Sequence, residues 1–277
     1  MKVLLLGAGG MLGHALVRQL ADQDMVVGDL PDFDITDFKS LNKKIREIKP
    51  EILINCAAYT DVDACEANAK LAEKVNGAAI ANLAKICSEL DIILIHYSTD
   101  YVFDGEKKQG VIEDWPAKPI NEYGRGKHLG EKNLTAGYDK YYLIRTSGLY
   151  GEHGKNFVDS ILSAAESKPE LKVVNDQFTS TTYTDDLAKA TREIIEQRPA
   201  FGIYHRTNSG SGSWYDFAKK IKELAGFTAK IVPVSSDDYK RPAQRPKFSK
   251  LINTKLKELR PWEEALEEYL SKKMIKL

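Results

Sequence analysis

Cysteine, net charge and long apolar runs are all scarce in this chain of 277 residues. The three cysteines, Cys56, Cys65 and Cys87, are odd in number and lack metal-site spacing, so we expect reduced thiols in a cytoplasmic protein and no metal centre. The 40 basic and 40 acidic residues cancel, which gives no reason to expect a nucleic-acid or membrane partner. No apolar run approaches the roughly 18 residues of a membrane span. A strand pattern starts almost at once, so we expect no signal peptide.

The first 16 residues carry the pattern around which the chain is organised. An apolar stretch, Val3 to Leu6, precedes the start of an amphipathic helix, and the turn between them contains Gly7, Gly9, Gly10 and Gly13. Such a turn directs several backbone N–H groups at one point, which suits an anion such as a pyrophosphate. The spacing is G-x-x-G-x-x-G from position 7, because Leu12 occupies the last glycine position of the commoner G-x-G-x-x-G pattern. We predict a dinucleotide-binding turn; the alternative is a glycine-rich turn without a ligand.

Apolar strand-like segments alternate with helical patterns over the first half of the chain. We expect strands at 3–6, 25–28, 51–55, 92–96 and 141–145, and helices at 37–48 and 70–90. This alternation predicts an α/β fold with a Rossmann-type, doubly wound parallel sheet. Further helices are expected at 156–167, 185–197, 213–224 and from 261, short strands at 172–175 and 203–205, and a loop at 237–249. We assign residues 1–147, with 183–206 returning, to an NAD(P)-binding core, and 148–182 and 207–277 to a smaller C-terminal substrate-binding lobe.

Several candidate binding residues follow the expected strands, and ligands of doubly wound sheets bind at the carboxyl ends of strands. Asp29 ends the second strand, where an acidic residue accepts hydrogen bonds from the adenosine ribose. Its charge would repel the additional phosphate of NADP and so favours NAD; a loop aspartate without a ligand is the alternative. Ala57, Ala58 and Tyr59 follow the third strand, where small residues let a cofactor lie against the backbone.

Tyr123 and Lys127 are one helical turn apart and therefore share a face. An ammonium about 4 Å from a phenol contributes on the order of 4 kcal/mol, which would lower the phenol pKa by roughly three units and prepare the tyrosine for proton transfer. Thr99, after the fourth strand, could hydrogen-bond a substrate carbonyl together with this tyrosine; capping a turn is its alternative role. The same spacing at Tyr215 with Lys219, and at Tyr269 with Lys273, predicts only a packing aromatic and a solvated lysine.

Several of these segments together resemble dTDP-4-dehydrorhamnose reductases, which are extended short-chain dehydrogenases. The resemblance rests on the glycine turn, NCAAYTDVDACE (55–66), YSTDYVFDG (97–105), Tyr123-x-x-x-Lys127 and RTS (145–147). Shorter segments that match the family pattern, at 156–157, 176–178, 182 and 245–249, extend the resemblance over nearly the whole chain. It implies reduction of the 4-keto group of a dTDP-4-dehydro-6-deoxyhexose, dTDP-4-dehydrorhamnose to dTDP-L-rhamnose, by NADPH or NADH.

The resemblance also implies the roles of individual residues. Thr99, Tyr123 and Lys127 would be catalytic, with Tyr123 as the proton donor. Thr99, Asp100 and Arg245 would contact the sugar nucleotide, Arg245 at its diphosphate, which suits a guanidinium; a surface loop arginine is the alternative. The implied cofactor contacts are Gly7, Gly10, Met11, Leu12, Gly13, Asp29, Asp34, Ile35, Ala57, Ala58, Tyr59, Tyr123 and Lys127. The family further suggests a homodimer.

The chain departs from the family pattern chiefly at the expected sugar pocket. Gly148 stands where the family has a tryptophan against the substrate, and Thr179 and Thr181 replace a glycine and a proline. Met11 replaces a glutamine, a smaller change because the backbone does the binding there. We therefore expect a reshaped pocket that admits a bulkier or different sugar.

Two other functions stay open at this point. One is a sugar-nucleotide epimerase or dehydratase with tightly bound NAD, but dehydratases usually carry Asp-Glu after the threonine, and here Tyr101 follows Asp100. The other is a non-catalytic, cofactor-binding regulatory subunit. Such a subunit need not retain both Tyr123 and Lys127, and this chain does.

Overall fold

Six short apolar segments form one parallel sheet in the computed structural model, which describes residues 1–275. The strand order is β10-β5-β4-β3-β1-β2, and all neighbours run parallel. The strands are β1 (Lys2–Leu6), β2 (Asp24–Gly28), β3 (Ile52–Asn55), β4 (Ile93–Thr99), β5 (Tyr141–Thr146) and β10 (Gly202–His205). The central strands are buried on both faces, as continuous apolar runs predict.

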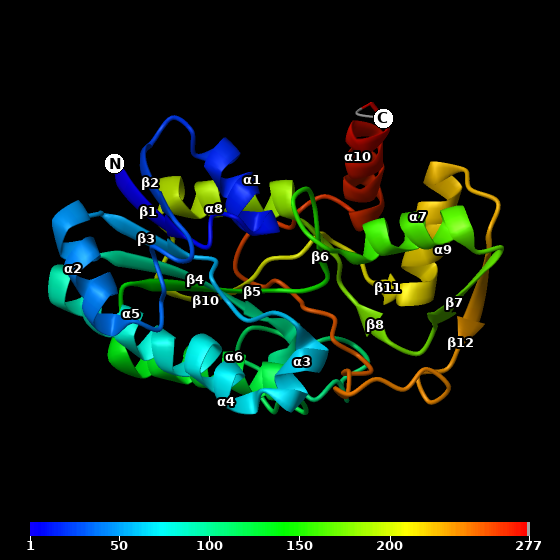
Figure 1. Ribbon diagram of the computed structural model, residues 1–277, viewed down its shortest axis with the longest axis horizontal. Helices are drawn as coiled ribbons and strands as arrows, with labels where there is room; N and C mark the ends of the chain where they lie inside the picture. Colours follow the sequence, from blue (N-terminus) through cyan, green and yellow to red (C-terminus); the bar gives the residue numbers. More distant parts are fainter. Residues whose placement is uncertain (276–277) are drawn as a thin grey trace.

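Helices cover both faces of this sheet (Figure 1). Alternate residues of β1 point to opposite sides: Val3 and Leu5 pack in one apolar cluster, Leu4 and Leu6 in the other. The first face is covered by α1 (Met11–Gln19) and α8 (Thr184–Gln197), and the second by α2 (Phe38–Ile48), α5 (Ala79–Leu90) and α6 (Glu122–Gly137). The predicted fold class, a doubly wound Rossmann-type sheet, is confirmed. None of the helices within residues 1–275 combines the length and apolar character needed to cross a bilayer.

The segment predicted as one helix over 70–90 is interrupted. The chain forms α3 (Val62–Ala67), α4 (Ala69–Ala72), a π-helical turn (Glu73–Ala78) and then α5. Asn76 lies inside the π-helical turn and is buried, and its side chain bonds to the backbone of the loop after β3. A π-helical turn inserts one residue into a helix without ending it, which apolar periodicity alone does not reveal.

The remaining residues form a smaller lobe beside the sheet (Figure 1). Its strands pair as β6 (Leu149–Tyr150) with β9 (Thr182–Tyr183), β7 (Glu170–Val174) with β12 (Lys230–Val234), and β8 (Phe178–Thr179) with β11 (Gly212–Ser213). Its helices are α7 (Phe157–Ser167), α9 (Trp214–Ala225) and α10 (Trp262–Ile275). Aromatic side chains dominate its core, among them Tyr150, Tyr183, Phe217, Trp262 and Tyr269. Of these lobe strands only β7 was predicted among the residues described; β6, β8, β9, β11 and β12 were not, and β12 contains a proline.

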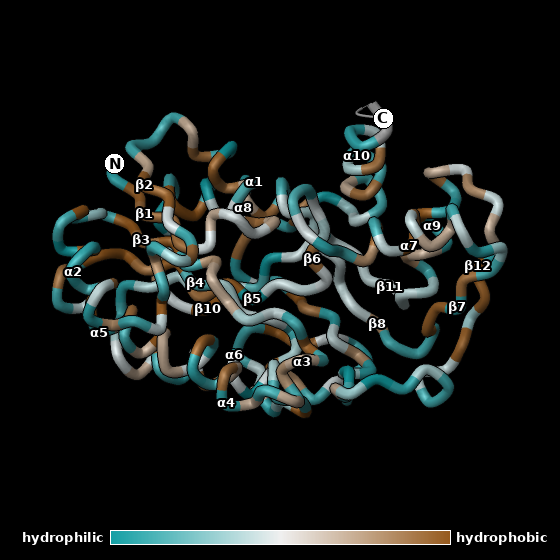
Figure 2. The backbone as a smooth tube through the Cα atoms, in the orientation of Figure 1, coloured by the Kyte–Doolittle hydropathy of each residue, from teal (hydrophilic) through white to brown (hydrophobic). Residues whose placement is uncertain are grey.

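The segment 237–249, predicted to be a loop, contains no regular element. It is orange in Figure 1 and largely teal, hence hydrophilic, in Figure 2, and it runs from β12 back toward α3. We call it the strap. Because it spans from the lobe to the sheet, its residues can form one wall of a site between them.

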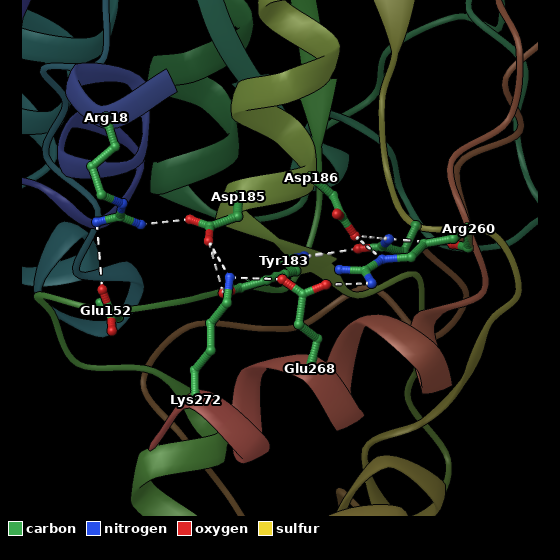
Figure 3. Close-up of polar contacts among 9 residues, drawn as sticks. Arg18, Glu152, Tyr183, Asp185, Asp186, Arg260, Glu268 and Lys272 are labelled. Carbon is green, nitrogen blue, oxygen red and sulfur yellow. Dashed lines mark hydrogen bonds and ion pairs between the residues drawn. The ribbon is translucent and has the colours of Figure 1, made fainter. Parts of the chain in front are cut away.

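A polar network joins α10 to the sheet helices (Figure 3). Asp185 of α8 accepts hydrogen bonds from Arg18 of α1 at 2.6 Å and from the Tyr183 hydroxyl at 2.9 Å, and pairs with Lys272 of α10 at 3.1 Å. Beside it, Arg260 pairs with Asp186 at 2.8 Å and with Glu268 at 2.6 Å. These contacts hold α10 against α8, which precedes β10, and through Asp185 link it to α1, which follows the glycine turn.

Candidate active site

The glycine turn lies beside the segment that follows β3, because β2 and β3 flank β1 on opposite sides. Gly7 has a φ of +77°, and a Cβ there would lie 2.5 Å from the Ala57 nitrogen. A Cβ on Gly13 would lie 2.3 Å from the Gly7 carbonyl oxygen, so both positions need glycine. Helix α1 begins at Met11 after Gly10, which supplies no side-chain cap. The N–H groups of its first turn therefore lack intrahelical partners, as at the N-terminus of any helix without a side-chain cap.

The loop after β2 fixes the acidic residues predicted to meet the cofactor. Asp29 accepts hydrogen bonds from the backbone N–H groups of Gly9 at 2.6 Å and Leu30 at 2.8 Å, which holds its carboxylate at the mouth of the glycine turn. Asp34 accepts a hydrogen bond from the Thr36 N–H at 2.8 Å, which lowers the pKa of Asp34. Two further predicted contacts, Leu12 and Ile35, have side chains buried in the apolar clusters, so they leave only backbone atoms for a ligand.

The loop after β3 is held by two asparagines. The Ala57 N–H donates to Asn55 Oδ1 at 3.2 Å. Tyr59 donates its N–H to Asn76 Oδ1 and accepts from Asn76 Nδ2 on its carbonyl oxygen, both at 2.9 Å. Asn76 therefore shapes the backbone of 57–59, where a cofactor is predicted to lie. No spacing signal in the sequence pointed to Asn76, because its π-helical turn looks like ordinary helix.

The three predicted catalytic residues converge at the ends of β4 and α6. Thr99 is the last residue of β4, and Tyr123 and Lys127 lie in the first turns of α6, whose N-terminus is capped by Asn121. Thr99 and Tyr123 line one cavity of about 180 Å³. Lys127 lies behind it, 3% exposed, and donates a hydrogen bond to the Tyr97 carbonyl oxygen at 2.6 Å.

The protonation states differ from the sequence-based argument. Burial raises the pKa of Tyr123 above its ordinary value, and the nearby Asp100 adds to this, whereas a hydrogen bond with Thr99 acts in the opposite direction. Burial lowers the pKa of Lys127 to about 8, although Glu131 opposes the change. The expected lowering of the phenol pKa by the ammonium is therefore wrong for this arrangement, because the ammonium is directed at the Tyr97 carbonyl. At neutral pH the phenol is protonated, as a proton donor must be.

Asp100 forms a polar wall of the same cavity. It is 2% exposed, and its Oδ1 accepts a hydrogen bond from the Thr99 hydroxyl at 2.9 Å. Its Oδ2 has no hydrogen-bond partner among the described residues. Burial raises the pKa of Asp100, while the hydroxyl groups of Ser249, Ser147 and Thr99 favour its ionised form. A buried acceptor left open on a cavity wall is suited to a hydroxyl group of a ligand.

Two of the departures from the family pattern, Gly148 and Thr179, line this cavity, whereas Thr181 is not part of its lining. Gly148 has a φ of +53°, and a Cβ there would lie 3.0 Å from the Ser180 carbonyl oxygen. Phe178 of β8 and Trp214 of α9 supply aromatic surface to the cavity, in addition to Tyr101 and Tyr123. Trp214 packs on Phe157 with ring centroids 4.6 Å apart. Sequence reasoning placed position 214 in a helix but did not place it at the site, since it lies 66 residues after Gly148 in the chain.

Arg245 lies on the strap, as does Pro246, which lines the cavity. The guanidinium of Arg245 pairs with Asp63 of α3, with Arg245 Nη2 2.9 Å from Asp63 Oδ2, and donates a hydrogen bond to the Ala243 carbonyl oxygen at 2.7 Å. The hydrogen bond from Arg245 lowers the pKa of Asp63 to about 2. In this structure Arg245 ties the strap to the sheet domain, and its contact with a diphosphate stays a prediction.

A buried ion pair that the sequence did not reveal supports the catalytic helix. Arg145 at the end of β5 donates to both carboxylate oxygens of Glu131 in α6, at 2.9 and 2.8 Å. Burial opposes ionisation of Glu131, but the hydrogen bonds of Arg145 outweigh it and lower the Glu131 pKa to about 2. Glu131 continues the face that carries Tyr123 and Lys127, so this pair anchors that face to the sheet.

The other tyrosine–lysine pairs lie outside the 180 Å³ cavity. The Lys219 ammonium lies 4.9 Å from the ring centroid of Tyr215 in α9, and the Lys273 ammonium 5.8 Å from that of Tyr269 in α10. Within residues 1–275 no group of three or more His, Cys, Asp or Glu side chains is placed to hold a metal ion, and all three cysteines are free thiols.

Comparisons with known proteins agree on one family. The family described as RmlD substrate binding domain matches residues 1–275. The spore coat polysaccharide biosynthesis protein SpsK of Bacillus subtilis is 40% identical, with 98% of each chain covered. A dTDP-4-dehydrorhamnose reductase structure from Clostridium acetobutylicum is 39% identical over all of both chains, with a TM-score of 0.96. One from Bacillus anthracis, solved with NADP, is 36% identical over 98% of this chain and 99% of that chain, with a TM-score of 0.95. This chain belongs to the dTDP-4-dehydrorhamnose reductase family.

Proposed function

We propose that this chain is an NAD(P)H-dependent reductase of the 4-keto group of a dTDP-4-dehydro-6-deoxyhexose, converting dTDP-4-dehydrorhamnose to dTDP-L-rhamnose. The observation that carries the proposal is the convergence of Thr99, Asp100 and Tyr123 on one cavity at the carboxyl ends of the strands, with Lys127 buried behind them. The reductase names and the NADP complex of the relatives support it.

The residues around the glycine turn fit a dinucleotide. The free N–H groups of the first turn of α1 suit its pyrophosphate, and the fixed carboxylate of Asp29 suits a ribose. The bound NAD(P)H supplies the hydride. In this proposal the Lys127 ammonium holds the nicotinamide ribose, which is why we count Lys127 in the catalytic set.

The chain's own part in the reaction is to hold and protonate the carbonyl oxygen. The Tyr123 hydroxyl donates a hydrogen bond to the 4-keto oxygen. When the sugar binds, Thr99 turns its proton from Asp100 Oδ1 to the same oxygen, and the two hydrogen bonds polarise the carbonyl as negative charge develops on it. Tyr123 then transfers its proton to that oxygen, which completes the new 4-hydroxyl, and the phenolate recovers a proton from solvent. The high pKa of Tyr123 keeps the proton in place until that charge appears.

The test is Tyr123→Phe, which keeps the ring and removes the proton. We expect turnover to fall by a factor on the order of 10² to 10⁴, the usual range for a general acid, while NAD(P)H affinity, followed by fluorescence titration, stays unchanged. Tyr215→Phe is the matched control, because Tyr215 has the same spacing to a lysine and lies outside the cavity. Unchanged turnover in Tyr123→Phe would end the assignment of the proton donor.

A cofactor assay separates the reductase from the alternatives. A reductase consumes one NAD(P)H for each 4-keto sugar, whereas an epimerase or dehydratase with bound NAD consumes none, and a regulatory subunit has no turnover. Assaying dTDP-, UDP- and GDP-4-keto sugars with NADH and NADPH would identify the nucleotide, the sugar and the preferred cofactor. We further propose a homodimer working in the cytoplasm, with no nucleic-acid partner; light scattering of the purified protein measures its oligomeric state.

A further inference from the structure

Three hydroxyl side chains meet behind the polar wall of the cavity, and we call Ser147, Thr179 and Ser249 the hydroxyl cluster. They come from three distant segments: the end of β5, β8 and the strap. The Thr179 hydroxyl lies 2.7 Å from that of Ser147 and 3.2 Å from that of Ser249. All three residues line the cavity and are at most 5% exposed. Thr179 is the position where the family pattern has a glycine.

Counting protons shows what the Thr179 hydroxyl does in this cluster. A hydroxyl group donates one hydrogen bond and accepts two. Thr179 accepts a hydrogen bond from Ser249, and while its own proton is donated to the Ser180 carbonyl oxygen at 3.2 Å it also accepts from Ser147. The Ser147 proton then lies on Thr179, whereas Ser249 shares its proton between Thr179 and the Phe178 carbonyl oxygen, which is 3.5 Å away.

The neighbouring carboxylate is affected by where these protons go. The hydroxyl groups of Ser147 and Ser249 also lie close to Asp100, close enough to favour its ionised form. Yet Oδ2 of Asp100 has no hydrogen-bond partner among the residues that the structure describes. An unpaired buried acceptor is costly, so something must hold the two serine protons away from it. The Thr179 hydroxyl does so for Ser147 and, together with the Phe178 carbonyl oxygen, for Ser249.

We propose that Thr179 is a positioning residue that keeps the Asp100 carboxylate open for a hydroxyl group of the sugar. This rests on the proposed reduction of a 4-keto sugar. The hydroxyl concerned is the one at C3. Thr99 holds the keto oxygen at C4, and its own Oγ1 lies only 2.9 Å from the Asp100 carboxylate, so the next oxygen along the ring meets Asp100. Thr179 thereby makes the enzyme selective for sugars that carry a 3-hydroxyl.

The first test uses Thr179→Val, which keeps the shape of the side chain and removes the hydroxyl. The serine protons are then free to turn to Asp100 and compete with the sugar. We expect the KM for the sugar nucleotide to rise by about tenfold, the usual value of one hydrogen bond to a charged group, with the KM for NAD(P)H unchanged. Thr179→Ser restores the hydroxyl and is expected to restore the KM.

Thr181→Val is the matched control, because Thr181 is equally buried and its hydroxyl has no hydrogen-bond partner among residues 1–275. We expect its KM values to equal those of the wild type. If Thr179→Val leaves the sugar KM unchanged, or if Thr179→Ser fails to rescue it, the positioning role is refuted. Equal increases in Thr179→Val and Thr181→Val would assign the effect to general packing and also refute it.

The second test removes the sugar hydroxyl instead of the protein hydroxyl. The wild type should prefer the parent 4-keto sugar to its 3-deoxy analogue by roughly tenfold in kcat/KM, and Thr179→Val should lose this preference. The 2-deoxy analogue serves as the control, because both proteins should treat it alike. A 3-deoxy preference of equal size in the two proteins contradicts the proposal.

Binding measured by calorimetry tests the role of Thr179 independently of whether the protein is a reductase. The same comparison can be made with dTDP-L-rhamnose and its 3-deoxy analogue as ligands, without turnover. An enzyme that consumes no NAD(P)H but shows the Thr179-dependent binding difference would overturn the proposed reduction and leave the subsite intact. A wild type that consumes NAD(P)H but shows no Thr179-dependent binding difference would support the proposed reduction and refute the role of Thr179.

Discussion

The buried pair between Glu131 and Arg145 allows a quantitative test of how the catalytic helix is held. Glu131 lies one turn after Lys127 and two turns after Tyr123, and its carboxylate meets the guanidinium of Arg145 through two hydrogen bonds. The two side chains are 4% and 5% exposed, so solvent screens the pair little. Glu131→Gln keeps the shape of the side chain but removes the charge, and it leaves Arg145 buried without a counter-ion.

The expected loss of stability can be worked from the pKa. Arg145 lowers the Glu131 pKa from its ordinary 4.5 to about 2, against the opposing effect of burial. At 1.36 kcal/mol per pKa unit, this difference corresponds to about 3 kcal/mol at neutral pH. Removing one partner of a buried pair generally costs roughly 3–5 kcal/mol, which agrees. Because the folded-state pKa is the lower one, the stabilisation is complete above about pH 5 and is lost as the pH falls through 4.5 toward 2.

Urea unfolding of the wild type, Glu131→Gln, Arg145→Met and the double variant measures these free energies. We expect the free energy of unfolding of each single variant to be about 3 kcal/mol lower than that of the wild type at pH 7, and that of the double variant to be lower by less. The difference between Glu131→Gln and the wild type should become smaller below about pH 5. Glu89→Gln is the control, since the pair of Glu89 with Arg46 is 41% and 45% exposed and should contribute at most about 1 kcal/mol. A loss in Glu131→Gln no larger than in Glu89→Gln, or a gap that widens in acid, would refute the reasoning.

Two further predictions concern the cofactor and the strap. Burial lowers the pKa of Lys127 to about 8, so its ammonium loses a proton above that pH and kcat/KM for NAD(P)H should decline above about pH 8. Lys127→Met should not show this decline in its pH profile. A wild-type profile that stays flat to about pH 10 would contradict the assignment. Asp63→Asn is expected to raise the sugar-nucleotide KM several-fold in steady-state assays, because Asp63 and Arg245 hold the strap that places Pro246 on the cavity wall. A lowered KM would instead mean that Arg245, once released, serves the diphosphate.

The parts of the structure that the sequence predicted depend on neighbours along the chain. The glycine turn could be identified because the residues from Gly7 to Gly13 form it by themselves, and the six strands because each is a short apolar run. Their common direction follows from the helices between them, so the parallel sheet and the place of Thr99 at a strand end followed as well. Tyr123 and Lys127 reached the same region because helical spacing fixes their shared face.

The supporting contacts escaped prediction because their partners are distant in sequence or hidden by an irregular turn. Asn76 bonds to the backbone of Tyr59 from a π-helical turn, and Arg245 meets Asp63 across 182 positions. No periodicity marks such pairs. The argument about the Tyr123 pKa failed for the same reason: it considered two side chains on an isolated helix, whereas burial of the phenol and the Tyr97 carbonyl decide the outcome.

The sugar pocket illustrates this limit most clearly. The sequence shows that Gly148 lacks the family's aromatic ring, but only the fold shows that Trp214 and Phe178 supply an aromatic surface from other segments. Thr179 likewise looks like a simple departure until its hydroxyl is found between Ser147 and another hydroxyl from the strap. Because each wall of this pocket combines residues from different elements, one substitution changes its chemistry only through partners elsewhere. Selectivity among 4-keto sugars must therefore be tested on combinations such as Thr179 with the sugar 3-hydroxyl, since neither group determines it alone.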